Sequence, residues 1–290
     1  MPVAHLTDRA VICIAGEDAT SFLSGLVTCA VESREGARYG ALLTPQGKVI
    51  ADFFLLFRGE AGGRFFLDAP RLVAEPLLKR LAMYKLRAKV TLSDVSGNSG
   101  VFAAWGGGSS AFSGSSGFTD PRLDAMGSRA VLPLAAAPSC DGSLADYDAH
   151  RIGLAVPQGG RDFAYGDAFP HEAAMDELAG VDFHKGCYVG QEVVSRMQHR
   201  GTARTRMAAL RFSGPAPSEG AEIKAGDKPM GRVGSVDAGN SRGIGLLRLD
   251  RLADALAAGN ALHAGETVLH AEKPGWARYA FPMNAVQETK

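Results

Sequence analysis

The amino-acid sequence predicts an α+β fold in which antiparallel sheets and packed helices are followed by a small β-barrel. Three consecutive β-like runs occupy Tyr39 to Leu43, Val49 to Phe57 and Arg64 to Leu67, and turn residues separate the first two. Apolar residues at helical spacing follow over Leu72 to Leu86. Beyond Arg204 the sequence changes to short β-like runs between turns, which is typical of a small barrel.

The earlier part of the chain alternates strands with helices. A strand over Ala10 to Ala15 precedes a short helix. The run from Phe53 to Phe57 does not alternate between apolar and polar residues, so its strand should be covered on both faces. Pro76 predicts a kink or a late start in its helix, because proline lacks the amide hydrogen. Further helices are expected over Leu144 to Leu154 and Glu172 to Leu178.

Two domains are predicted, a first domain over residues 1–204 and a β-barrel domain over residues 205–290. The segment 105–118 consists largely of glycine and serine, with few side chains able to pack, so we expect a mobile loop within the first domain. The barrel strands are expected at Met207 to Phe212, Arg232 to Val236, Gly243 to Leu249 and Thr267 to Ala271.

Composition excludes several classes of protein. The 31 basic and 31 acidic side chains cancel, so no global field favours a membrane surface or a long nucleic acid. Four scattered cysteines without a C-x-x-C pair favour a reducing compartment. The N-terminus lacks the pattern of a secretory leader, and no run approaches about 18 apolar residues. We therefore expect a cytoplasmic monomer.

The stretch from His184 to Glu192 carries the strongest chemical signal. Cys187 lies in a glycine-rich turn before a helix expected over Val193 to Arg200, with Glu192 in its first turn and Gly201 as its stop. Unpaired amides at a helix start would stabilise a thiolate, and Lys185 would add to the effect. The alternative is a small cysteine that only packs in a tight turn.

Other catalytic and metal-binding patterns are not supported. His184, Cys187 and His199 are the only close set of metal ligands, and their spacing matches no zinc template, so no metal site is predicted. The sequence has no G-x-S-x-G nucleophile elbow. The glycines at 106–108 lack the lysine of a phosphate-binding loop.

Basic residues cluster in the sequence beside Cys187. Arg196 and Arg200 should share one face of the predicted helix because they are one helical turn apart. We expect a local patch for an acidic ligand or partner, such as the tail of a folate, and the alternative is a solvated face paired with acids elsewhere. Its members are Lys185, Arg196, Arg200, Arg204, Arg206 and Arg211.

The residues from Lys185 to Glu192, KGCYVGQE, closely resemble the K-G-C-[YF]-x-G-Q-E signature of the YgfZ family, folate-binding proteins related to the T-protein of glycine cleavage. The likeness extends over most of the first two thirds of the chain. It implies a T-protein-like folate-binding domain, tetrahydrofolate or a derivative as ligand, and a role in iron-sulfur cluster assembly or repair. Iron-sulfur client or assembly proteins would be its partners.

The resemblance also implies roles for individual residues. Cys187 and Lys185 are expected to form the reactive pair. Where the T-protein has a glutamate that contacts the pterin, this chain has Gly153, which argues against classical aminomethyl transfer. A folate-dependent one-carbon transferase, with a small amine or tRNA as substrate, is the alternative function, and a non-catalytic scaffold is a third. The residues expected to order the turn or contact folate are Gly186, Tyr188, Gly190, Gln191, Glu192, Arg196 and Arg200.

Overall fold

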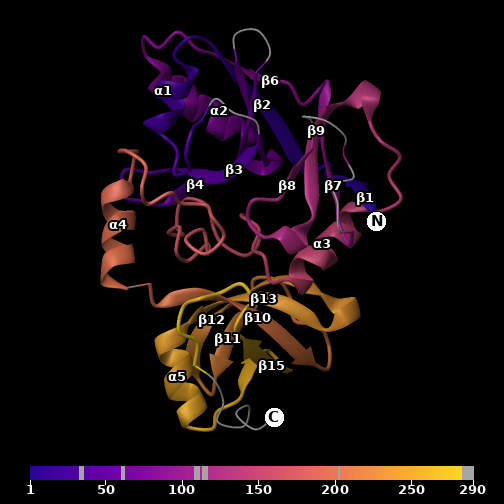
Figure 1. The fold of residues 1–290 in the computed structure, drawn as a ribbon. Coiled ribbons are helices and arrows are strands. Elements are labelled where there is room, and N and C mark those ends of the chain that lie inside the picture. The colour runs from indigo at the N-terminus through magenta and orange to yellow at the C-terminus, as the bar shows by residue number, and fades with distance from the viewer. Residues whose placement is uncertain (33–35, 60–62, 108–111, 113–116, 202, 283–290) are drawn as a thin grey trace.

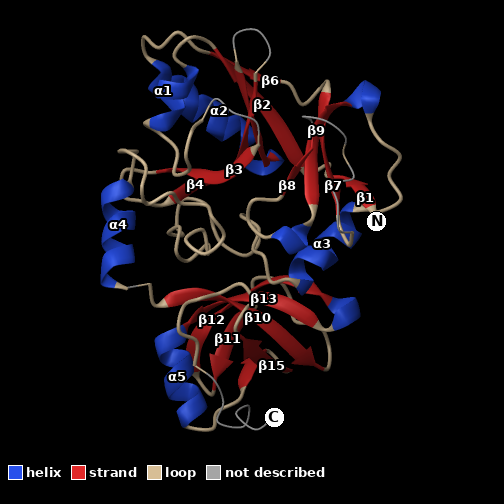
Figure 2. Ribbon diagram, viewed as in Figure 1, coloured by secondary structure: helices blue, strands red, loops and turns tan. Residues whose placement is uncertain are grey.

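The computed structural model describes residues 1–282 except 33–35, 60–62, 108–111, 113–116 and 202. Within these residues the chain forms a five-stranded sheet, a four-stranded sheet and a closed barrel, with helices packed around them (Figures 1 and 2). All of the strand pairs between named elements are antiparallel in the described residues. The predicted α+β class with a C-terminal β-barrel is therefore confirmed.

The five-stranded sheet carries much of the apolar core. Its order is β3 (Ala37–Leu43), β4 (Val49–Arg58), β5 (Arg64–Pro70), β2 (Arg9–Ala15) and β6 (Thr91–Asp94). β4 lies between two neighbours and is buried on both faces from Ala51 to Leu56, as its uninterrupted apolar run predicts.

Two helices pack on this sheet, α1 (Ala19–Ser24) and α2 (Arg71–Lys85). Leu23 of α1 and Leu77 and Leu81 of α2 enter the same apolar cluster as the sheet residues. Of the two outcomes predicted for Pro76, a kink or a late start, the late start is wrong, because α2 begins at Arg71 and contains Pro76, which is exposed.

The four-stranded sheet has the order β1 (Val3–His5), β7 (Ser99–Ala104), β9 (Ser128–Pro133) and β8 (Gly117–Thr119). Short 3-10 turns lie at Asp124–Met126 and Leu134–Ala136. α3 (Leu144–Gly153) packs beside this sheet, and a capping box formed by Ser143 and Asp146 fixes its start. Most of the predicted mobile loop, 105–118, lies outside the described residues.

The C-terminal strands close into a barrel in the order β10 (Thr205–Ser213), β13 (Arg242–Arg248), β12 (Lys228–Asp237), β11 (Glu222–Ala225), β14 (Leu262–Ala264) and β15 (Thr267–Glu272). A 3-10 turn at Ala238–Asn240 and the helix α5 (Leu249–Ala257) complete it. The four predicted barrel runs coincide with β10, β12, β13 and β15, except that Leu249 begins α5. Sequence reasoning missed β11, β14 and α5.

A long irregular segment, residues 154–190, lies between the sheets and the barrel (Figure 1). The helix expected over Glu172 to Leu178 is wrong, because this stretch is a series of turns. Ala174 and Ala179 adopt left-handed backbone angles, with φ of 57° and 55°, and such residues interrupt a helix. α4 (Gln191–Arg200) follows at the edge of the molecule. No described helix is long and apolar enough to span a membrane.

Candidate functional site

The turn that carries Cys187 is anchored by Lys185. The ammonium of Lys185 donates hydrogen bonds to the carbonyl oxygens of Ser24, Val27 and Cys29 at 3.1, 2.7 and 2.8 Å. Burial lowers the pKa of this lysine, and the nearby Asp182 opposes the shift. The three N–H donors of Lys185 thus bind backbone acceptors at the last residue of α1 and just after it. Lys185 fixes the turn, and this contact differs from the expected role of tuning the thiolate.

Cys187 itself is exposed and forms no disulfide. Its neighbour Tyr188 is buried in the core cluster beneath the sheets, and burial raises the pKa of its hydroxyl to about 12. Upstream, Asp182 accepts hydrogen bonds from the backbone amides of His184 and Lys185 at 2.9 and 3.2 Å. Lys185 and Tyr188 therefore hold the turn in place, while the side chain of Cys187 between them is exposed. The alternative that Cys187 only packs in a tight turn is wrong.

The helix after the motif begins at Gln191, two residues before the expected Val193, and Glu192 lies in its first turn as predicted. Gly190 is its N-cap with φ of 83°, and a Cβ there would lie 2.6 Å from the carbonyl oxygen of Thr44. Gly201 ends the helix in the left-handed region, as expected. Gly186, in contrast, has open space around it. Gly190 is required by the packing of α4 on the β3–β4 turn, while Gly186 is not.

The basic residues near the motif do not form one patch. Arg196 pairs with Glu192 one helical turn earlier, Arg206 is buried against Asp176 at 2.8 Å, and Arg211 pairs with Glu272 at 3.4 Å. Gln191 is half-buried, and Arg200 is exposed at the end of α4. Arg196, Arg204, Arg206 and Arg211 thus all pair with acids, as the alternative predicts, and do not form a free basic patch.

A second candidate site, which we call the polar pocket, lies between the two sheets and α3. It has a volume of about 560 Å³, within the range of small-molecule sites. None of its described lining residues belongs to the Cys187 turn or to α4. The lining residues are Leu6, Asp8, Arg9, Asp52, Arg122, Arg129, Leu144, Ala145, Tyr147, Asp148, Arg151, Pro157, Gln158 and Arg161.

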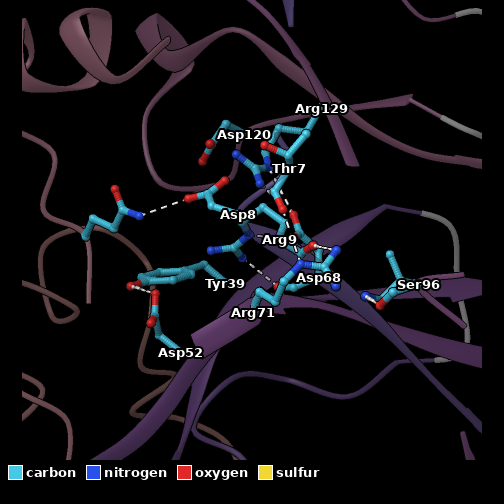
Figure 3. A network of polar contacts seen from close by, with 12 residues as sticks. Thr7, Asp8, Arg9, Tyr39, Asp52, Asp68, Arg71, Ser96, Asp120 and Arg129 are labelled. Carbon is cyan, nitrogen blue, oxygen red and sulfur yellow. Dashed lines mark hydrogen bonds and ion pairs between the residues drawn. The ribbon is translucent and has the colours of Figure 1, made fainter. Parts of the chain in front are cut away.

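Buried ion pairs build the wall of the polar pocket. Asp68, fully buried on β5, accepts from Arg9 Nε at 2.5 Å and from Arg129 Nη2 at 2.6 Å (Figure 3). Burial by itself would raise the pKa of Asp68, but the guanidiniums of Arg129 and Arg9 outweigh it and hold that pKa below its usual value. Arg129 also donates to the hydroxyl of Tyr147 at 2.8 Å.

The remaining arginines of the polar pocket are paired as well. Arg122 forms a bidentate contact with Asp120, at 3.0 and 2.8 Å. Arg151 binds Asp148 and Asp162, and Arg161 binds Asp148 and Glu219. Five guanidiniums thus meet five carboxylates, counting Asp68, Asp120, Asp148, Asp162 and Glu219.

Two carboxylates of the polar pocket have only neutral partners among the described residues. Asp52 accepts from the hydroxyls of Tyr39, at 3.0 Å, and of Tyr165. Asp8 accepts from the Gln158 side-chain amide at 3.1 Å, and its other oxygen, Oδ1, is buried without a hydrogen-bond partner. Figure 3 shows Asp8 beside Arg9 and Asp52 beside Tyr39. The uncompensated charge of this arginine-rich pocket is therefore negative.

Sequence reasoning missed the polar pocket, although a signal for it existed. Asp52 and Asp68 stand in otherwise apolar strands, where an unpaired charge would be very costly. A charged residue inside such a run indicates either a buried ion pair or a binding site. Here Asp68 forms buried ion pairs, and Asp52 lines the polar pocket.

Comparison with known proteins supports the fold. The chain matches the solved glycine cleavage system aminomethyltransferase T from Bartonella henselae with a TM-score of 0.71, over 97% of this chain and 87% of that one, at 16% identity. Residues 204–279 match the family described as "CAF17, C-terminal beta-barrel domain". The first match covers sheets and barrel together, so the whole described chain follows one known architecture.

Sequence relatives carry a common name. The chain is 33% identical to the "Iron-sulfur cluster assembly factor IBA57 homolog, mitochondrial" of Mycosarcoma maydis, over 72% of this chain and 57% of the relative. The Neurospora crassa protein of the same name is 32% identical, over 74% and 55%. The chain thus spans little more than half the length of these relatives.

The comparisons also correct one expectation. A cytoplasmic location is contradicted, because these relatives are named as mitochondrial proteins. Specific membership of the YgfZ family stays an inference from the KGCYVGQE motif. Taken together, the chain is similar to proteins named as IBA57 homologues, its residues 204–279 match the CAF17 barrel domain, and it has the fold of aminomethyltransferase T.

Proposed function

We propose that this protein is an accessory factor for iron-sulfur cluster assembly or repair that binds tetrahydrofolate in the polar pocket. Its relatives' names support the assembly role. The observation that supports the ligand is the pocket itself, with about 560 Å³ of space and two carboxylates that lack a cationic partner in the described residues. Iron-sulfur client or assembly proteins would then be the partners of the exposed Cys187 turn.

The charge balance of the polar pocket favours one end of a folate over the other. The reduced pteridine ring presents a row of N–H donors, whereas the glutamate end presents carboxylates. Because the five arginines are already paired, Asp8 Oδ1 and Asp52 are the groups left to receive a ligand. Hydrogen bonds from a neutral donor to a carboxylate are among the stronger ones in proteins. We therefore orient the pteridine ring inward and the glutamate end toward solvent.

The polar pocket does not depend on a glutamate at position 153. Gly153 lines a different cavity, behind the end of α3, and so does not face the polar pocket. Asp52 is held by two tyrosines, and burial and Asp52 together raise the pKa of the Tyr39 hydroxyl well above its ordinary value. That hydroxyl therefore stays protonated and donates to Asp52, which fixes the carboxylate before a ligand arrives.

Calorimetric titration with tetrahydrofolate tests the ligand. Asp8→Asn and Asp52→Asn should each weaken binding by about tenfold or more, the equivalent of one charge-assisted hydrogen bond. Asp227→Asn is the matched control, because Asp227 is exposed in the barrel and outside the pocket. No heat at millimolar tetrahydrofolate, or equal loss in all three variants, would exclude folate from this pocket.

The assembly role needs its own measurement. In a deletion strain, activities of iron-sulfur enzymes should be restored by the wild-type chain and by Asp227→Asn, and restored less by Asp8→Asn. Full restoration by a variant that has lost tetrahydrofolate binding would separate the two halves of the proposal. The assembly role would then stand without the folate.

A further inference from the structure

A second cavity lies on the other side of α3, where the helix end meets the barrel. It has a volume of about 360 Å³. Its apolar wall includes Leu123, Leu154 and Trp276, and the indole N–H of Trp276 donates to the carbonyl oxygen of Leu154 at 2.9 Å. The tryptophan ring is thereby fixed in place as part of the cavity wall.

Basic side chains give this cavity its charge. Arg211, Arg242 and Lys273 line it together with one acid, Glu272, and Glu272 is paired with Arg211 at 3.4 Å. Arg242 has no ion pair among the described residues, and its Nε is buried without a hydrogen-bond partner. A buried donor without an acceptor is costly, so an acceptor is the group that this cavity lacks.

Glycine at position 153 leaves room for that acceptor. A Cβ placed on Gly153 would lie 3.3 Å from Nη1 of Arg242. Any longer side chain would therefore project onto the guanidinium, and an acidic one would pair with it. Because the chain has glycine there, no side chain of residue 153 covers the guanidinium at the end of α3.

We propose that this cavity, which we call the Arg242 pocket, binds a small oxyanion carrying an apolar body. The carboxylate or phosphate head meets Arg242 and Lys273, and the body packs on Trp276 and Leu154. The site is separate from the polar pocket, because the two cavities share no lining residue. The protein would thus bind a second ligand where the end of α3 meets the barrel.

The simplest competing explanation is that Arg242 is only a cation at a helix C-terminus, where the helix dipole favours positive charge. That explanation requires no cavity and no preference for an apolar body. It predicts weak binding of any anion, with strong dependence on salt.

Tryptophan fluorescence separates the two explanations. The chain has two tryptophans, and Trp105 lies elsewhere, against Tyr147 and His150. In a Trp105→Phe background, phenyl phosphate should change the Trp276 emission saturably, and inorganic phosphate should bind at least about tenfold more weakly.

Variants of Arg242 and of Gly153 complete the test. Arg242→Gln should weaken phenyl phosphate at least about tenfold. Gly153→Glu should weaken phenyl phosphate binding to the same extent, because its carboxylate, at the exposed end of α3, would pair with Arg242 in place of the ligand. Arg232→Gln, an exposed arginine outside the cavity, should bind like its parent. No saturable change with phenyl phosphate, or equal loss in Arg232→Gln and Arg242→Gln, would overturn the proposal.

Discussion

The polar pocket and the Cys187 turn are built in opposite ways. The pocket is held by buried ion pairs drawn from both sheets, such as Asp68 with Arg9 and Arg129. The turn is an exposed loop held by one lysine, one glycine and one buried tyrosine. A preformed pocket suits a small ligand, and an exposed thiol on an anchored loop suits contact with another protein. Single substitutions should therefore cost more stability in the first region than in the second.

The largest effect is expected at Asp68. Asp68→Asn leaves two guanidiniums without their carboxylate, and breaking a buried pair costs about 3 to 5 kcal/mol of the free energy of unfolding. Urea denaturation measures the loss. Asp227→Asn should change that free energy little, because Asp227 is exposed. A loss equally small in both variants would mean that the buried pair contributes nothing to the stability of the pocket.

The Asp68 effect should depend on pH with a definite sign. Its folded pKa is held below the unfolded value of about 3.9, so the stabilisation is present above that value and is lost as the pH falls through the folded pKa. The difference between wild type and Asp68→Asn in the free energy of unfolding should therefore be constant near neutral pH and shrink below about pH 4. A difference that grew in acid would contradict this sign.

Glycine substitutions compare two positions within the Cys187 turn. Gly190→Ala places a Cβ 2.6 Å from the Thr44 carbonyl oxygen at a φ of 83°, and should lower the free energy of unfolding by about 1 to 3 kcal/mol. Gly186→Ala meets open space and serves as the matched control. Thermal unfolding of both variants is the measurement. Similar melting temperatures would show that α4 can shift away from the β3–β4 turn.

Lys185 should affect stability about as much as Gly190 and should also affect the conformation of the loop. Lys185→Met keeps the length of the side chain but removes three hydrogen bonds to backbone carbonyls. We expect the free energy of unfolding to fall by about 1 to 3 kcal/mol. Because the turn loses its anchor, the alkylation rate of Cys187 should change as well. If only the rate changed and the stability did not, Lys185 would act on the thiol and the sequence-based expectation would be restored.

These contrasts show where sequence reasoning succeeds and where it fails. The helix α4 was predictable because its signals, Glu192 and Gly201, are local to it. The partners of Lys185 were not, because Val27 and Cys29 are more than 150 residues away in the chain. The acid partner of Arg206 was missed for the same reason, since ion pairing depends on folded geometry that charge counting along the sequence does not contain.

The false helix over Glu172 to Leu178 has a related cause. Apolar residues at helical spacing were present, but the left-handed backbone at Ala174 allows that spacing to be met by consecutive turns. Nothing in the local sequence distinguishes the two, because alanine ordinarily favours a helix. The packing of Met175 and Leu178 against the core decides the outcome.

The smallest change in stability is expected at Cys187 itself, because its side chain is exposed and makes no disulfide. Cys187→Ser should alter the free energy of unfolding by no more than about 0.5 kcal/mol, as exposed substitutions usually do, yet it should abolish restoration of iron-sulfur enzymes in a deletion strain. Cys140→Ser is the matched control, because Cys140 is also exposed but lies in the segment before α3. The two thiols differ in their setting and not in their exposure. Full restoration by Cys187→Ser would therefore show that the anchored turn, rather than its sulfur, is what the partner recognises.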